Sequence, residues 1–87
     1  MYIEFYEAKW CTACHGIKPH VISACKELGI DIEYIDADQS ADYCVARNVG
    51  SLPTIIAYND SGNELDRIIG TVGKYDFIKR ITDSMKE

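Results

Sequence analysis

The chain has 87 residues, of which 47% are apolar, and a formal net charge of -5. This length and composition predict one packed domain over residues 1–87. The acidic charge, without a Lys/Arg cluster, argues against nucleic acid or an anionic membrane as a partner, and no apolar run is long enough to span a membrane.

The N-terminal third is expected to form a strand followed by a helix. The run "YIEFY" at 2–6 is rich in β-forming residues. Pro19 should kink the helix that follows, and Gly29 is expected to end it. Apolar residues at three- and four-residue steps would share one face of this helix, namely Ile17, Val21, Ala24, Cys25 and Leu28.

The rest of the chain adds three strands and two helices. Strands are expected at 30–36, 53–58 and 64–69, with the turn "NDSGN" between the last two. Asp38 or Ser40 can cap a short helix that runs to about Arg47. Gly73 precedes a last helix. Its apolar face would comprise Phe77, Ile78, Ile81 and Met85.

The order β-α-β-α-β-β-α predicts an α/β fold. A strand–helix–strand unit joins two parallel strands by a right-handed crossover. The later hairpin and the last helix would complete a four-stranded mixed sheet with helices on both faces. The two cysteines of "WCTACH" (10–15) then lie where the first strand ends and the first helix begins.

This position favours redox chemistry for Cys11 and Cys14. The first turn of a helix presents unpaired backbone N–H groups and the positive end of its dipole, which favour the thiolate of Cys11. Cys14, one turn later, can reach Cys11 and form a disulfide. A disulfide that closes so short a loop stabilises folding by only roughly 2 kcal/mol, so a reversible redox role is expected rather than a structural one.

The motif at 11–15 is also compatible with haem attachment or with zinc binding. Haem attachment through C-x-x-C-H would need His15 on the iron, a second axial ligand such as Met85, and export. Glu4 and Glu7 interrupt the apolar stretch that a signal peptide needs, so the cytoplasm is the expected location. A zinc site would need two more ligands without a second closely spaced pair, so neither metal nor cofactor is expected. Its candidate ligands are Cys25, Cys44, His15 and His20.

The chain resembles the thioredoxin family over nearly its whole length. The matching features, in family order, are Trp10-Cys11-x-x-Cys14, Pro19, "IDADQS" (35–40), "SLPT" (51–54) and Gly70. The resemblance implies a minimal thioredoxin fold in which Pro53 is cis and faces the redox pair. It also implies a protein-disulfide reductase.

In that reductase Cys11 would attack a client disulfide and Cys14 would resolve the mixed disulfide. The expected partners are disulfide-containing client proteins and a thioredoxin reductase, and the chain is expected to be a monomer. The resemblance places the substrate-binding surface at Trp10, Thr12, Ala13, Leu52, Pro53 and Gly70.

The chain also departs from the family pattern. It starts at the central strand, without the usual N-terminal strand and helix, and Thr12-Ala13 replaces Gly-Pro. Phe5 and Tyr34 stand where the family has a buried Asp and its Lys partner. Water is therefore the expected acceptor of the Cys14 proton, with Glu7 as the rival acceptor unless it turns outward. A glutaredoxin-like enzyme and a non-catalytic module are the alternative functions.

Overall fold

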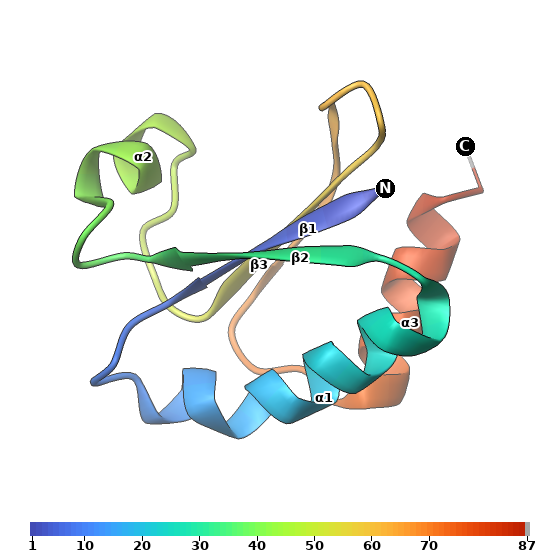
Figure 1. Ribbon diagram of the computed structural model, residues 1–87, viewed down its shortest axis with the longest axis horizontal. Coiled ribbons are helices and arrows are strands. Elements are labelled where there is room, and N and C mark those ends of the chain that lie inside the picture. The colour runs from blue at the N-terminus through green and yellow to red at the C-terminus, as the bar shows by residue number, and fades with distance from the viewer. Residues whose placement is uncertain (87) are drawn as a thin grey trace.

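The computed structural model describes residues 1–86 and contains all seven expected elements in the expected order (Figure 1). The strands are β1 (Tyr2–Glu7), β2 (Asp31–Asp36), β3 (Thr54–Tyr58) and β4 (Glu64–Ile69). The helices are α1 (Thr12–Leu28), α2 (Ala41–Ala46) and α3 (Lys74–Ser84).

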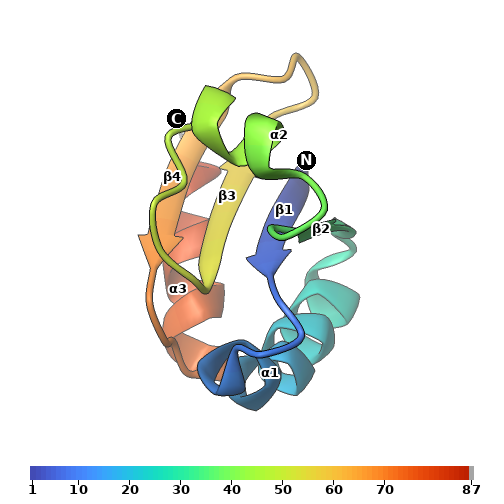
Figure 2. The ribbon, with the colours of Figure 1, turned by 90° about the vertical axis from the view of Figure 1, so that its left-hand side faces the viewer.

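The four strands form one mixed sheet in the order β2-β1-β3-β4. Strand β1 is parallel to β2 and antiparallel to β3, which is antiparallel to β4. Helices α1 and α3 lie on one face of the sheet and α2 lies on the other, as the two views at right angles show (Figures 1 and 2). The predicted α/β architecture is therefore confirmed.

Helix α1 has well-defined ends. Cys11 is its N-cap, and Gly29 ends it in the left-handed conformation, with φ 69°, that glycine adopts without strain. Gly29 is the C-cap residue, and its backbone N–H donates to the carbonyl of Cys25. Pro19 lies inside the helix, as expected. The buried residues follow the predicted spacing and are Cys14, Ile17, Val21, Ala24 and Cys25.

Each face of the sheet has its own apolar cluster. The larger cluster lies under α1 and α3 and includes Phe5, Ile55 and Phe77. The smaller one lies under α2 and comprises Tyr6, Cys44, Ile56 and Tyr58. Because side chains alternate along a strand, neighbouring residues of β1 serve opposite clusters.

Two local expectations need correction. Ser40 occupies the N-cap position of α2, but its side chain makes no capping hydrogen bond, and Asp38 lies further upstream. Helix α3 ends at Ser84, so Met85 is its C-cap rather than part of its apolar face, and the Met85 side chain is exposed. Over residues 1–86, no helix has both the length and the apolar character needed to cross a membrane.

Candidate active site

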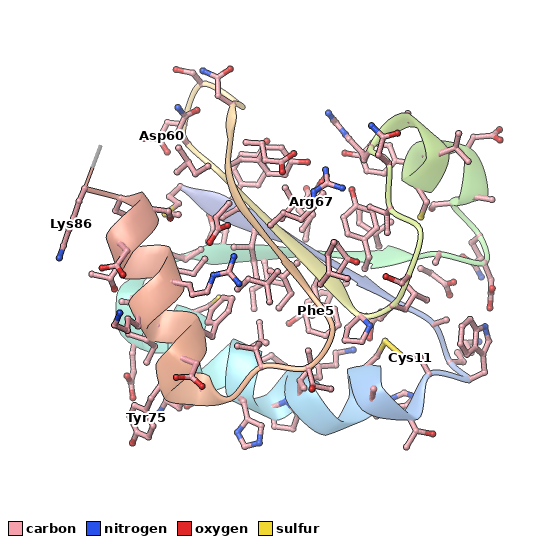
Figure 3. All side chains as sticks on the ribbon, turned by 180° about the vertical axis from the view of Figure 1, so that it is seen from behind. Phe5, Cys11, Asp60, Arg67, Tyr75 and Lys86 are labelled. Carbon is pink, nitrogen blue, oxygen red and sulfur yellow. A yellow bond between two sulfur atoms is a disulfide. The ribbon has the colours of Figure 1, made fainter. Side chains whose placement is uncertain are left out.

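Cys11 and Cys14 form a disulfide at the start of α1, with their Cα atoms 5.3 Å apart (Figure 3). The Cys14 backbone N–H donates to Cys11 Sγ at 3.1 Å. Cys11 keeps 5% of its surface exposed, whereas Cys14 keeps none. In the reduced state, this backbone donor and the helix dipole favour the thiolate of Cys11.

Trp10 is exposed, with 66% of its surface accessible. Its indole Nε1 donates to Asp38 Oδ2 at 2.9 Å. Asp38 follows β2, and parallel β1 and β2 end at the same edge of the sheet. From the sequence, Asp38 was expected as a possible helix cap, within the family-like segment 35–40. Its acidic side chain at the carboxyl end of a neighbouring parallel strand is the signal that could have revealed this contact.

Pro53 and Gly70, both expected at the substrate-binding surface, lie next to each other. The Leu52–Pro53 peptide bond is cis. The backbone N–H of Gly70 donates to the carbonyl of Pro53 at 2.9 Å, and Gly70 has φ 93°, a left-handed conformation that glycine favours. Pro53 itself is fully buried, while Leu52 and Gly70 are partly exposed.

An apolar groove of about 330 Å³ lies against Trp10, the residue that precedes Cys11. Trp10 and Leu52, both expected at the site, line it from the motif and from the loop before β3. The other wall comes from α2 and the loop after it and was not predicted, because the apolar residues of so short a helix are as consistent with a core face as with a site. The residues of this wall include Ala41, Cys44, Val45 and Val49.

Comparisons with known proteins agree with this geometry. The family model described as Thioredoxin matches residues 1–83. The chain belongs to the thioredoxin family. It is 31% identical to a thioredoxin of Mycolicibacterium smegmatis over 95% of this chain and 76% of that protein. It is 33% identical to a thioredoxin of Chlamydia trachomatis over 92% of this chain and 78% of that protein.

The fold comparison agrees. The structure of thioredoxin 1 from Thermosipho africanus superposes with a TM-score of 0.86, at 26% identity, over 99% of this chain and 96% of that one. Family membership and the Cys11–Cys14 disulfide make the chain a thiol–disulfide oxidoreductase.

Two aromatic rings, Phe5 and Tyr34, lie where the resemblance implied a buried charged pair. Phe5 and Tyr34 are partners in the β1–β2 register, with ring centroids 6.3 Å apart. Phe5 is fully buried, but Tyr34 is 47% exposed, so only one of the two aromatic rings is buried. Lys18 Nζ lies 4.8 Å from the centre of the exposed Tyr34 ring. Because Phe5 is the buried ring of the two, the buried end of the site is apolar.

Glu7 does not turn outward, so the condition that would have removed it as the rival acceptor is not met. Its carboxylate accepts two hydrogen bonds from Lys18 Nζ, at 3.0 and 3.1 Å, and only 16% of its side chain is exposed. Lys18 lies one helical turn after Cys14. The pair borders a pocket of about 240 Å³ behind the motif, which His15 also lines. Charge thus lies at the margin of the buried apolar region.

The remaining cysteines and histidines do not join the site as ligands. His15 and His20 are exposed, while Cys25 and Cys44 are buried free thiols in the clusters on opposite faces of the sheet. Burial raises the pKa of the Cys25 thiol to about 11 and also raises that of Cys44. In the described part of the chain, no three His, Cys, Asp or Glu side chains converge as metal ligands.

Proposed function

We propose that the chain is a protein-disulfide reductase of the thioredoxin type, with Cys11 as nucleophile and Cys14 as resolving thiol. The asymmetry of the pair carries this assignment. Cys11 lies at the helix N-cap, retains some exposure and accepts a backbone N–H, whereas Cys14 is fully enclosed. A client sulfur can therefore approach Cys11 before it could approach Cys14.

The reaction proceeds in two exchanges. The Cys11 thiolate attacks one sulfur of the client disulfide, so a mixed disulfide forms and the other client sulfur leaves as a thiolate that takes up a proton. Cys14 then loses its proton and attacks the Cys11 sulfur, which releases the second client thiolate. The client gains two electrons and two protons, and the product is the Cys11–Cys14 disulfide found in the structure.

A client chain would rest on the exposed surface around the pair. Trp10, Thr12 and Ala13 are exposed, and Leu52 and Gly70 contribute partly exposed surface, with Pro53 beneath them. The groove is apolar, whereas a glutathione-binding site would need charged groups around it. A thioredoxin reductase is therefore the proposed electron donor. The proposal also includes a monomer and the reducing cytoplasm, where Cys25 and Cys44 remain free thiols.

Insulin reduction with dithiothreitol tests this proposal, with Cys11→Ser and Cys14→Ser as matched variants. Wild type should accelerate reduction, and both variants should lose this activity. Cys14→Ser should accumulate a mixed disulfide through Cys11, visible by mass spectrometry. If Cys11→Ser accumulates the mixed disulfide instead, the two roles are reversed. An inactive wild type would favour the alternative that the chain is a non-catalytic module.

The electron donor needs a separate comparison. The oxidised protein should be reduced by thioredoxin reductase with NADPH and much more slowly by glutathione at a physiological concentration. Efficient reduction by glutathione alone would favour the glutaredoxin-like alternative.

A further inference from the structure

Glu4, on the face of the sheet opposite Phe5, is a carboxylate that the redox chemistry does not use. It is 2% exposed and lies in the middle of the central strand β1. Three tyrosine hydroxyls donate to it: those of Tyr6 and Tyr58, each at 2.7 Å, and that of Tyr43. A buried carboxylate without donors would be strongly destabilising, so this arrangement is a satisfied polar cluster.

Tyr43 differs from the other two tyrosines because it lies on α2. Tyr6 and Tyr58 belong to β1 and β3 and bind Glu4 within the sheet. Arg47, the C-cap of α2, donates to the Tyr43 hydroxyl at 3.2 Å, and its guanidinium lies 5.0 Å from the centre of the Tyr43 ring. The Glu4–Tyr43 hydrogen bond thus ties α2 to the central strand.

Helix α2 depends on such ties because it has little apolar anchorage. It has six residues, and Cys44 is its buried residue. Its loop receives a second hydrogen bond from the sheet, since Nη1 of Arg67, the residue labelled in Figure 3, donates to the carbonyl of Asn48 at 3.0 Å. Ala41 and Val45 of α2 line the apolar groove beside Trp10, whereas Tyr43 lines a different pocket together with Glu4.

We propose that Glu4 is a positioning residue that acts through Tyr43: it fixes α2, and with it the groove wall against which a client protein docks. The inference rests on the proposed function, because it assumes that clients bind beside the redox pair. Its consequence is that losing the Glu4–Tyr43 bond weakens client binding without slowing thiol chemistry.

Tyr43→Phe and Tyr58→Phe form a matched pair for the test. Each removes one hydroxyl from Glu4, but only Tyr43 lies on α2. Tyr43→Phe should raise the KM for insulin about fivefold with kcat unchanged, the equivalent of one hydrogen bond. Tyr58→Phe should leave this KM unchanged. Reduction of a small disulfide, 5,5′-dithiobis(2-nitrobenzoic acid), should be equally fast in both variants and wild type, since it does not need the groove wall.

Hydrogen exchange supplies a readout that is independent of activity. Amides of α2 should exchange faster in Tyr43→Phe than in Tyr58→Phe, and Glu4→Gln should resemble Tyr43→Phe. Equal KM values for the two tyrosine variants, or unchanged exchange in α2, would overturn the positioning role. An inactive wild type would instead overturn the proposed function, while the exchange result would still show whether Glu4 holds α2.

Discussion

The two faces of the sheet treat charge in opposite ways. Phe5 and Glu4 are adjacent in β1, point to opposite faces and are both buried. On the α1/α3 face the buried region next to the redox pair is apolar, and the Glu7–Lys18 pair stays at its margin. On the α2 face a carboxylate is buried at the centre, because three tyrosine hydroxyls donate hydrogen bonds to it. Neighbouring donors, rather than depth alone, decide where a charge is tolerated.

The pKa values on the α2 face express this balance. Burial alone would raise the pKa of Glu4, but hydrogen bonds from Tyr43, Tyr58 and Tyr6, together with the Arg47 charge, lower it below its usual value. Burial and the nearby carboxylate raise the pKa values of Tyr6 and Tyr58 in turn. The cluster therefore holds one negative charge and keeps its hydroxyls protonated over the neutral range.

The largest expected effect belongs to the apolar face. Phe5→Ala should lower the free energy of unfolding by about 3–5 kcal/mol, because it opens a cavity in the larger cluster. Urea unfolding of the oxidised protein measures this loss, and Phe5→Leu, which leaves a smaller cavity, should recover much of it. A smaller loss in Phe5→Ala than in Glu4→Gln would reverse the ranking of the two faces.

Glu4→Gln should cost about 1–3 kcal/mol near neutral pH, because the charge-assisted hydrogen bonds become neutral or are lost. Since the pKa of Glu4 is lowered on folding, its contribution is present above the usual glutamate pKa of about 4.3 and is lost as the pH falls through the folded value. The variant should therefore lose less stability than wild type on acidification in this range.

Glu33→Gln is the matched control for this experiment. Glu33 is the register partner of Glu4 on β2, but its side chain is exposed. Its replacement should change the free energy of unfolding near neutral pH by no more than about 0.5 kcal/mol. The loss of stability on acidification should also stay within about 0.5 kcal/mol of the wild-type loss. If wild type and Glu4→Gln lose the same stability on acidification, the carboxylate is no better stabilised in the folded chain than in the unfolded one.

The contrast between the faces also marks what could be predicted from the sequence. The element order, the mixed sheet and the redox pair follow from periodicity, turn residues and one spaced motif. Glu4 was not predictable as a buried charge, since an acidic residue in a short strand looks solvated. Its donors Tyr43 and Tyr58 are 39 and 54 residues away and meet it only in the folded chain. The Trp10–Asp38 and Glu7–Lys18 contacts were missed for the same reason.

Each face of the sheet contains one free thiol, so the reactivities of Cys25 and Cys44 compare the two faces directly. In the native, oxidised protein Cys44 should react with iodoacetamide at least about fivefold faster than Cys25, because local opening of short α2 exposes it. Burial also raises the pKa of Cys25 to about 11, which suppresses its thiolate. Peptide mapping by mass spectrometry assigns each site. Denatured, oxidised protein should show two reactive thiols, and a count of zero would mean that Cys25 and Cys44 had formed a bridge.

The smallest expected effect concerns Glu7. Cys14 must lose a proton before it resolves the mixed disulfide, and in its apolar surroundings the thiolate is disfavoured by desolvation. Both hydrogen bonds described for the Glu7 carboxylate come from Lys18, so we expect water or hydroxide to accept this proton. Glu7→Gln should lengthen the mixed-disulfide lifetime less than about twofold, whereas loss of a true general base typically costs a hundredfold or more.

Rapid quenching of the reaction with a client disulfide measures this lifetime as a function of pH. In wild type, resolution should accelerate steadily across the neutral range, as expected for transfer to water or hydroxide. Phe5→Asp should hasten resolution near neutrality and lower stability, because it buries a carboxyl group among apolar residues without a partner. A lifetime at least about tenfold longer in Glu7→Gln, with the fold intact, would instead identify Glu7 as the acceptor. The apolar face would then also use a charge, held at its margin rather than at its centre.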